Sequence, residues 1–307
     1  MKNKSLIIEN FKNNITYKCL IGNNKKWKVD EEIFIKRGDI LIKIKKVDSN
    51  KVFFSWDKNI LWEELLNLIG QMPIPPYLNR KTEKIDEKSY QTIYSKKKGS
   101  VAAPTAGLHF SKKTFVKIEK NNIKTDYFTL HVGLGTFKPI LEKKIINHKM
   151  HTEEVIFTKK NIYNILSTKS ITAVGTTSLR ILESIYWFGV MLFNNKNKVV
   201  FEIKKLEPYK NHKYLPNKLK SINKVLNYME ENNLDVIKGQ TSIFIFPGYK
   251  FMICDQLITI FHLPKSTLIL LIASFIGDNW KKVYKFALKN NYRFFSYGDS
   301  SLLFKKK

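Results

Sequence analysis

Over the first 60 residues, apolar and polar side chains alternate in short runs that are interrupted by Gly, Asn and Asp. The apolar runs lie at residues 17–21, 33–35, 40–44 and 52–56. A period of two with turn residues between the runs predicts β-strands joined by tight turns. We therefore expect an antiparallel β-meander, followed by a helix over residues 61–69 that ends at Gly70.

From about residue 99 the pattern changes to strands that alternate with helices. Apolar residues at helical spacing follow Ser111, Thr158 and Ser266, and each of these three is a favourable N-cap residue. The predicted helices cover residues 111–120, 159–166, 178–188, 219–230, 267–276 and 280–289, and the predicted strands cover 127–132, 171–174, 243–246, 257–261 and an extended end at 292–304. This alternation predicts an α/β fold.

Prolines at positions 73, 75 and 76 exclude regular structure between the two patterns and indicate a linker. We therefore predict two domains, a β-rich barrel-like domain over residues 1–70 and an α/β catalytic domain with a mixed sheet over residues 71–307. Residues 192–238 are rich in Lys and Asn and have weak periodicity, so we expect a peripheral insertion there.

The chain is strongly basic, because its 307 residues include 54 Lys and Arg against 26 Asp and Glu, a formal net charge of +28. Four of these basic residues are arginine, so 50 are lysine. An AT-rich coding sequence produces the same bias without any ligand. Charge alone therefore leaves two alternatives open, a polyanionic partner such as nucleic acid and a generally lysine-coated surface.

Cysteine content and hydropathy exclude several classes of protein. Cys19 and Cys254 are too few for a disulfide framework, a four-thiolate zinc site or a three-cysteine iron–sulfur cluster. The most apolar stretch, residues 257–276, is interrupted by a His, a Pro and a Lys, and no secretory signal is visible. We expect no metal, no membrane span and a cytoplasmic location.

Residues 99–110 are dominated by Gly and Ala and end in His109 and Phe110. Small side chains let a ligand approach the backbone, and an imidazole exchanges protons near neutral pH. The segment is a candidate substrate-lining loop, in which Thr105 would bind and His109 would transfer a proton. The alternative is a tight structural turn with a buried histidine.

Two further segments contribute candidate histidines. His131 precedes Gly133 and Gly135, which only loosely resemble a phosphate loop because the third glycine is absent. His151 lies two residues before Glu153, and His148 is three residues before His151. Two histidines at i, i+3 with one carboxylate are common by chance, so we do not expect a metal there.

Residues 173–180 read Ala-Val-Gly-Thr-Thr-Ser-Leu-Arg. This string runs from the end of a predicted strand into a predicted helix, so Thr176, Thr177 and Ser178 lie at the start of the helix. Hydroxyls, free N–H groups and the positive end of the helix dipole favour an anion there. Arg180 can add a bidentate contact to that anion, or it can instead pair along the helix with Glu183.

Three later segments, 246–249, 261–267 and 292–299, combine aromatic rings with a few polar groups. Such segments can hold a flat base and read its edge, and the alternative for their rings is packing in the core. Asp299 follows a glycine, so it is a candidate acceptor for an amine or a base N–H. The other residues singled out there are Tyr249, His262, Arg293 and Tyr297.

In this order the segments resemble the S-adenosylmethionine:tRNA ribosyltransferase-isomerase family of queuosine biosynthesis. The matching strings are residues 72–77, 90–94, 99–110, 129–137, 150–153, 174–184, 246–251, 257–267 and 292–299. The resemblance implies an enzyme that transfers and isomerises the ribosyl moiety of S-adenosylmethionine onto 7-aminomethyl-7-deazaguanine at the tRNA wobble position. The products are epoxyqueuosine-tRNA, adenine and methionine.

The resemblance also implies S-adenosylmethionine as ribosyl-donor substrate, tRNA as partner, no metal, and a cytoplasmic enzyme that we expect to be a monomer. The sulfonium acidifies its neighbouring carbon, so a base can take a proton there. We expect catalytic residues among His109, His131, His151, Glu153 and Asp299. We expect substrate-binding residues among Thr105, Gly133, Gly135, Thr176, Thr177, Ser178, Arg180, Tyr249, His262, Arg293 and Tyr297.

Two departures from the family pattern give an alternative. The family begins with a longer segment that includes an Asn-Asn-Thr-Arg-Val type motif, and we expect this chain to lack it, which leaves the first domain incomplete. The family also favours Asn where this chain has Ile260. The alternative is therefore an impaired, truncated member that only binds RNA. An ordinary methyltransferase is disfavoured, since no glycine-rich loop follows a first strand.

Overall fold

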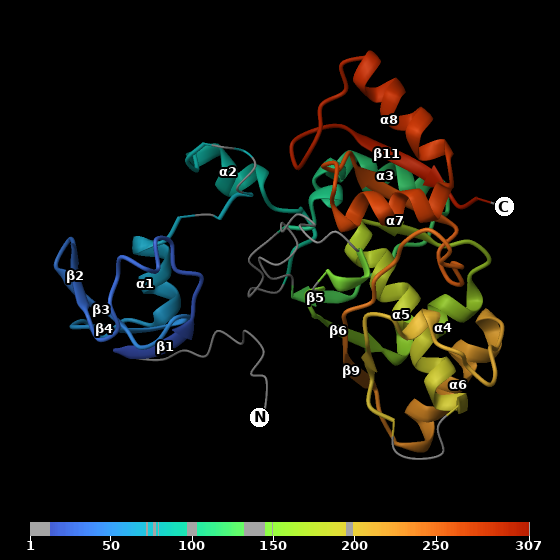
Figure 1. Ribbon diagram of the computed structural model, residues 1–307, viewed down its shortest axis with the longest axis horizontal. Helices are drawn as coiled ribbons and strands as arrows, with labels where there is room; N and C mark the ends of the chain where they lie inside the picture. The colour runs from blue at the N-terminus through green and yellow to red at the C-terminus, as the bar shows by residue number, and fades with distance from the viewer. Residues whose placement is uncertain are drawn as a thin grey trace. The chain divides into compact units, whose positions relative to one another are not determined.

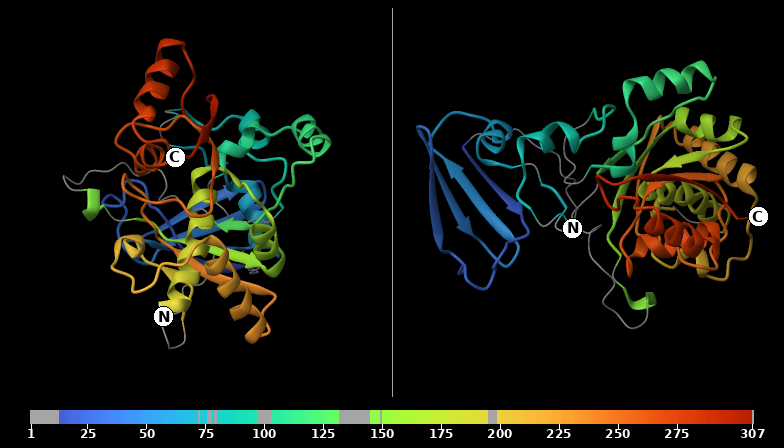
Figure 2. Two further views of the ribbon diagram at one scale, coloured as in Figure 1. Left: turned by 90° about the vertical axis from the view of Figure 1, so that its right-hand side faces the viewer. Right: turned by 90° about the horizontal axis from the view of Figure 1, so that it is seen from above.

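The computed structural model describes residues 13–71, 73–75, 78, 80–96, 103–131, 145–148, 150–194 and 199–306. The chain divides into two compact units, Met1–Pro73 and Ile74–Lys307 (Figures 1 and 2). Within the described ranges no helix is both long enough and apolar enough to cross a bilayer.

The first unit is a four-stranded antiparallel sheet with one helix. Its elements are β1 (Asn14–Lys18), β2 (Glu32–Arg37), β3 (Ile40–Lys46), β4 (Lys51–Trp56) and α1 (Trp62–Ile69). The strand order is β1-β4-β3-β2, so the predicted meander is confirmed for β2 to β4, whereas β1 lies beside β4. Closure of this sheet into a barrel stays a prediction.

Side chains alternate between the two faces of this sheet. One face packs on α1, where Ile15, Ile42 and Trp56 are buried with Trp62 and Leu65 of the helix. The other face, which we call the outer face, carries the residues at the alternate positions. These are Asn14, Thr16, Lys18, Glu32, Phe34, Lys36, Leu41, Lys43, Lys45, Lys51, Phe53 and Ser55.

The second unit alternates helices and strands, which confirms the predicted α/β class. Its strands are β5 (Thr129–His131), β6 (Glu153–Thr158), β7 (Thr172–Val174), β8 (Glu202–Ile203), β9 (Val236–Thr241), β10 (Gln256–Ile260) and β11 (Ser300–Phe304). Its helices are α2 (Lys84–Ser89), α3 (Lys112–Lys120), α4 (Lys159–Ser167), α5 (Thr176–Asn194), α6 (Lys218–Glu231), α7 (Thr267–Ile276) and α8 (Asn279–Lys289), with short turns η2 (Thr105–His109), η4 (Ile145–Asn147) and η5 (Glu207–Tyr209).

Two mixed sheets organise this unit. One has the order β11-β10-β7, in which β7 is parallel and β11 antiparallel to β10. The other has the order β5-β6-β9-β8, in which β8 is parallel to β9 and the remaining pairs are antiparallel. The mixed sheets agree with the predicted fold class.

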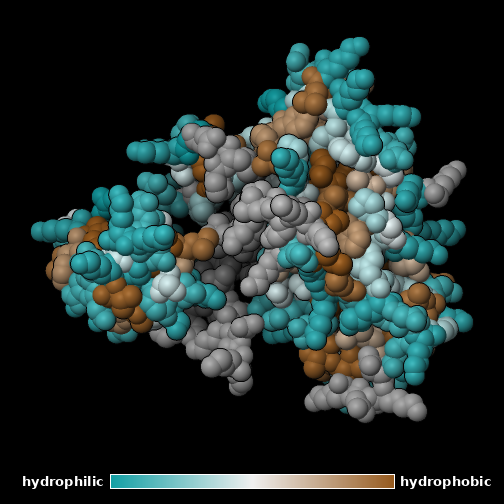
Figure 3. All heavy atoms as spheres, viewed as in Figure 1, coloured by the Kyte–Doolittle hydropathy of each residue, from teal (hydrophilic) through white to brown (hydrophobic). Residues whose placement is uncertain are grey.

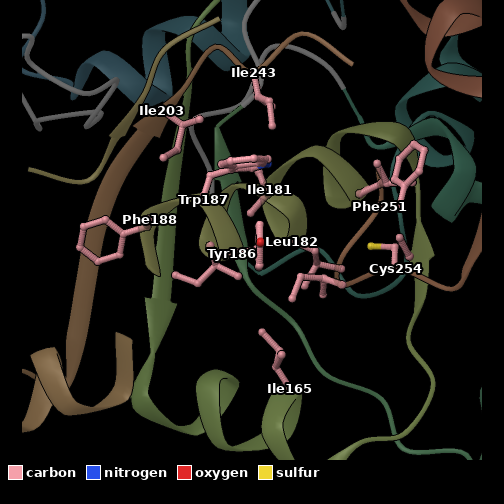
Figure 4. Close-up of a cluster of buried hydrophobic side chains, with 14 of the residues drawn as sticks. Ile165, Ile181, Leu182, Tyr186, Trp187, Phe188, Ile203, Ile243, Phe251 and Cys254 are labelled. Atoms are coloured by element: carbon pink, nitrogen blue, oxygen red, sulfur yellow. The ribbon is translucent and has the colours of Figure 1, made fainter. Parts of the chain in front are cut away.

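Helix α5 forms the centre of the core. Every residue from Leu179 to Val190 is buried, which is typical of a helix that is covered on all sides (Figure 4). Helix α6 approaches α5 closely at Gly189, where a Cβ atom would collide with the backbone of Ser221. The predicted helix started at residue 178 and ended at 188, so the real helix extends beyond it at both ends.

Residues 199–238 contribute to this core rather than forming the peripheral insertion that we expected. Ile222, Val225 and Met229 of α6 and Ile203 of β8 are fully buried beside α5. The weak periodicity misled the prediction, because the many Lys and Asn residues cover the outer side of elements whose inner side is apolar.

The strand predicted at residues 243–246 is wrong. The segment is apolar and mostly buried, but β9 ends at Thr241, and backbone carbonyls beyond it accept hydrogen bonds from side chains. The Ile243 carbonyl accepts the Arg180 Nε–H at 3.1 Å, and the Phe244 carbonyl accepts the Tyr209 hydroxyl at 3.0 Å. A continuous apolar run cannot by itself distinguish a buried strand from a buried loop.

Candidate functional site

A buried polar cluster, defined by His151, Glu153 and Arg180, lies where β6 begins and where α5 completes its first turn. Arg180 Nη1 is 2.9 Å from Glu153 Oε2. His151 Nε2 lies 3.1 Å from Glu153 Oε1 and 3.3 Å from Arg180 Nη1. Glu153 and Arg180 are almost fully buried, whereas the side chain of His151 is one fifth exposed. The cluster therefore reaches solvent through the imidazole.

The start of α5 places Arg180. Gly175 has a φ of +93° and its N–H bonds to the Ile258 carbonyl at 2.8 Å, so the chain turns sharply from β7 into the helix. Strands β7 and β10 are parallel, and ligands of α/β proteins bind beyond the carboxyl ends of such strands. Long helical side chains point back toward the helix N-terminus, which directs Arg180 to this edge.

One nitrogen of the Arg180 guanidinium is left without a partner. Its Nε donates to the Ile243 carbonyl and its Nη1 pairs with Glu153, but its buried Nη2 has no hydrogen-bond partner among the described residues. A buried donor without a partner costs about 1–3 kcal/mol, so such a group indicates a place for a ligand atom. The alternative pairing with Glu183 is not formed, because Glu183 accepts bonds from the N–H groups of Met252, Ile253 and Cys254.

The charge of Glu153 is set by its neighbours. Burial acts to raise the pKa of this carboxyl group, but the positive charge of Arg180 and hydrogen bonds from His151 and Thr177 outweigh burial and lower the pKa. Glu153 is therefore a carboxylate at neutral pH. A carboxylate orients the imidazole that bonds to it, so Nε2–H of His151 donates to Glu153 and the lone pair remains on Nδ1.

The small-residue loop lies next to this helix start. A Cβ atom on Gly175 would stand 3.8 Å from the Cβ atom of Ala106, in η2. Gly107 is required because a Cβ there would collide with the hydroxyl of Tyr94. Thr105 is half-buried and His109 is exposed, so the predicted alternative of a buried histidine is not what the structure has.

A turn formed by residues 293–299 carries Asp299. Its carboxylate accepts the Arg293 N–H at 2.7 Å and lies 3.2 Å from Arg293 Nη2. These two bonds lower the pKa of Asp299, and the charge of His109 adds a smaller contribution in the same direction. His109 and Asp299 therefore lie near each other, although they are 190 residues apart in the chain. The predicted extended end is limited to β11.

Sequence reasoning missed Asp86 and Arg80. Asp86 is fully buried and accepts two bonds from Arg80, at 2.7 and 2.8 Å, and one from the Tyr297 hydroxyl at 2.7 Å. Tyr297 is thus the anchor that fastens the 293–299 turn to α2. A signal was present, because Arg80 is one of only four arginines in a lysine-rich chain and an acidic residue follows it six positions later.

Other predicted site residues lie elsewhere. Tyr249 is buried in the core, where its hydroxyl donates to Glu183 and accepts from Trp187. His262 is buried, and desolvation lowers its pKa to about 4, so the ring is neutral and bonds to Thr259. Neither ring has a free face for a base. Ile260 is also buried, in β10.

Gly133 and Gly135 lie outside the described residues, and only the backbone of His131 is described, as the end of β5. Over the ranges that the structure covers, no three His, Cys, Asp or Glu side chains gather as metal ligands. Thr176 is buried at the start of α5, next to Thr177, which bonds to Glu153.

Together these observations define a class of protein. It has an α/β unit and a small antiparallel β unit, and a buried His–Glu–Arg cluster lies at the start of a helix that follows the carboxyl end of a parallel strand. The chain belongs to the queuosine biosynthesis protein family, whose model matches residues 2–303.

Curated relatives of this chain share one name. A protein named S-adenosylmethionine:tRNA ribosyltransferase-isomerase from Thermoanaerobacter sp. (strain X514) is 36% identical over 306 residues, 97% of this chain and 76% of that protein. Its namesake from Buchnera aphidicola subsp. Schizaphis graminum (strain Sg) is 43% identical over 242 residues, 77% of this chain and 57% of that protein. The solved S-adenosylmethionine tRNA ribosyltransferase from Thermotoga maritima aligns with 94% of this chain and 70% of that one, with 24% identity and a TM-score of 0.42.

Proposed function

We propose that this chain is an S-adenosylmethionine:tRNA ribosyltransferase-isomerase that acts in the cytoplasm on tRNA carrying 7-aminomethyl-7-deazaguanine. The proposal is supported by family membership and by the name that its relatives share. In the reaction, the carbon beside the sulfonium loses a proton, adenine leaves with a proton on its ring nitrogen, the tRNA amine bonds to the sugar, and epoxide closure expels methionine.

The observation that carries the assignment of the site is the unpaired Nη2 of Arg180 beside the N-terminus of α5. S-Adenosylmethionine has a carboxylate, and a carboxylate matches both the guanidinium and the N–H groups of Thr177 and Ser178. We therefore place the methionyl carboxylate at Arg180. Glu153 keeps this guanidinium fixed, because the two side chains form a buried ion pair at 2.9 Å.

His151 is our candidate for the base that removes the proton. Glu153 holds its Nε2–H, so Nδ1 carries the lone pair that can accept a proton. The ring is partly exposed, as a base that must reach substrate has to be. If Arg180 binds the methionyl carboxylate, His151 would lie close to the acidic carbon beside the sulfonium of the same S-adenosylmethionine molecule.

His109 and Asp299 are our candidates for the second half of the reaction. His109 is exposed on the loop that approaches Gly175, and Asp299 lies near it with a lowered pKa. An imidazole can protonate the departing adenine, and a carboxylate can accept the N–H groups of the tRNA amine. The net charge of +28 favours the tRNA polyanion. We propose that one chain suffices for this reaction.

The proposal is tested by incubating the protein with S-adenosylmethionine and precursor-bearing tRNA and measuring the released base. We expect adenine and methionine in equal amounts, formed only when the tRNA is present. Release of S-adenosylhomocysteine instead would identify a methyltransferase. Binding of tRNA without adenine release would favour the alternative of an impaired, RNA-binding family member.

Alanine variants test the two histidines separately. His151→Ala and His109→Ala should each lower the rate of adenine release by about 10²–10⁴-fold, the usual contribution of a placed proton-transfer group. His212→Ala is the matched control, because His212 bonds to the Glu207 carbonyl away from the cluster. Unchanged turnover in both variants would remove the proton-transfer assignment.

A further inference from the structure

The outer face of the β1–β4 sheet is basic and partly aromatic. Five of its positions are lysines, namely Lys18, Lys36, Lys43, Lys45 and Lys51, and Glu32 is the one acidic residue among its twelve described positions. Phe34 lies on it with 58% of its surface exposed. Exposed apolar atoms interrupt the hydrophilic surface of this unit in Figure 3.

The register sets aromatic and cationic side chains side by side. Phe34 lies opposite Lys43, and Phe53 lies opposite Lys45. By strand geometry, the two rings are about 12 Å apart, since they are two strands and two residues from each other. That separation lets the two rings contact two different bases.

The charges on this face are not balanced within the protein. Lys18 lies directly opposite Lys51, and like charges in this position repel. Lys43 pairs with Glu32 at 2.6 Å, and this exposed bridge contributes little to stability.

Lys45 pairs with Asp30 at 2.9 Å, and Lys51 pairs with Asp48 at 3.2 Å. Both of these carboxylates lie in turns outside the strands. Lys18 and Lys36 form no ion pair with any described residue. The face therefore retains positive charge that an anionic partner would neutralise.

We propose that the outer face of this sheet binds an unpaired strand of RNA. Bases stack on exposed aromatic rings, and lysines contact the phosphates that link them. A duplex hides its bases and offers only phosphates, so it would use the lysines and leave Phe34 and Phe53 without a role. The inference rests on the proposed function in one respect, which is that the natural strand belongs to the tRNA substrate.

The test measures binding of a fluorescein-labelled, single-stranded 12-nucleotide RNA of mixed A and U to the full chain by fluorescence anisotropy. Phe34→Ala should weaken binding roughly 5- to 150-fold, the range expected when one stacking ring is removed. Phe286→Ala is the matched control, because Phe286 is 60% exposed on α8 of the other unit. It should bind RNA like the wild type.

A salt series tests the lysines. The double variant Lys18→Gln/Lys36→Gln should reduce the slope of log affinity against log salt by about 1.4, since each contact to a single strand contributes about 0.7. Lys281→Gln/Lys282→Gln on α8 is the control and should keep the wild-type slope. Each variant is first checked for an unchanged thermal unfolding curve, which is expected because all of these side chains are on the surface.

The outcomes separate the alternatives. Equal losses in the face variants and the controls would mean general polyelectrolyte binding and would overturn the proposal. An equal effect of Phe34→Ala on a 12-base-pair duplex would overturn the stacking role. Binding to phosphatidylserine vesicles that Phe34→Ala abolishes, with RNA binding unchanged, would assign the face to a membrane instead.

The two proposals can fail independently, because this assay contains no S-adenosylmethionine. If the wild type releases adenine but Phe34→Ala binds RNA normally, the RNA-binding face is wrong and the enzymatic function stands. If the face binds RNA but no adenine is ever formed, the enzymatic function is wrong and the face stands.

Discussion

At the scale of single residues, the site depends on how Arg180, Glu153 and His151 share their hydrogen-bonding groups. Arg180 uses Nε for the Ile243 carbonyl and Nη1 for the cluster, which leaves Nη2 for a ligand. The guanidinium directs its N–H donors from three nitrogen atoms in fixed directions, whereas the three N–H groups of a lysine ammonium radiate from one atom and cannot reach all of these positions. We therefore expect that lysine cannot replace Arg180.

Arg180→Lys should raise the KM for S-adenosylmethionine about 10- to 150-fold, because it removes a charge-assisted hydrogen bond to the carboxylate. Initial rates of adenine release at varied S-adenosylmethionine concentration measure this effect. Arg37→Lys, on the exposed strand β2, should leave KM unchanged. A normal KM in Arg180→Lys would mean that the carboxylate binds elsewhere.

His262 should make stability depend on pH. Its pKa falls to about 4 in the folded chain and is near 6.5 when unfolded, so between these values the unfolded chain binds one proton more. Stability should therefore fall with decreasing pH in this window, by about 1.4 kcal/mol per pH unit. Urea unfolding at pH 5 and 7 should show this slope in the wild type and a smaller slope in His262→Gln. An identical slope in both would contradict the assignment.

Prediction from the sequence succeeded for residues whose hydrogen-bond partners are close in the chain, and it failed for residues whose partners are far away in the chain. Ser111, Thr158 and Ser266 were predicted as N-caps, and each side chain accepts the expected backbone N–H. Arg180 was left with two possible roles, because its real partner Glu153 is on another element. No local pattern indicates that Tyr249 bonds to Glu183 across 66 residues.

At the scale of elements, the site depends on segments that join only in three dimensions. The 293–299 turn bonds to α2 through Tyr297 and Asp86, which are 211 residues apart. Elements with a clear period, such as α3, α4 and α7, were predicted almost to the residue. The turn was predicted as extended chain, because its aromatic residues resemble a strand.

Tyr297→Phe removes one hydrogen bond to Asp86 and should loosen this turn. We expect a fall in Tm of about 2–4 °C and a severalfold lower kcat for adenine release, with an unchanged KM for S-adenosylmethionine. Tyr292→Phe is the control, since the Tyr292 ring packs against Phe261 and Phe286 and its hydroxyl has no hydrogen bond to a described residue. Equal kcat values in the two variants would show that the anchor does not position Asp299.

Asp86 should also contribute to acid sensitivity. Hydrogen bonds from Arg80, and then from the Glu83 N–H and Tyr297, lower its pKa below the usual value. A carboxyl group with a lowered pKa stabilises the fold above its ordinary pKa near 3.9, and this contribution is lost as the pH falls below that value. Acid unfolding followed by circular dichroism should show a shallower transition in Asp86→Asn. A transition as steep as that of the wild type would remove Asp86 from this role.

At the scale of the whole molecule, we assign a different ligand to each of the two units. The second unit holds the cluster at the start of α5, where the small substrate is expected to bind. We propose that the first unit offers an RNA strand its basic outer face, with the exposed ring of Phe34 and the half-buried ring of Phe53. The large positive charge of the chain favours a polyanionic substrate, and five of its lysines lie on the outer face of the first unit.

The central claim is tested most directly by mass spectrometry of the wobble nucleoside after the protein has acted on precursor-bearing tRNA and S-adenosylmethionine. We predict that the 7-aminomethyl-7-deazaguanosine is converted into epoxyqueuosine by the wild type and far more slowly by Arg180→Lys. Recovery of the unchanged nucleoside from tRNA that the wild-type protein demonstrably binds would contradict the account.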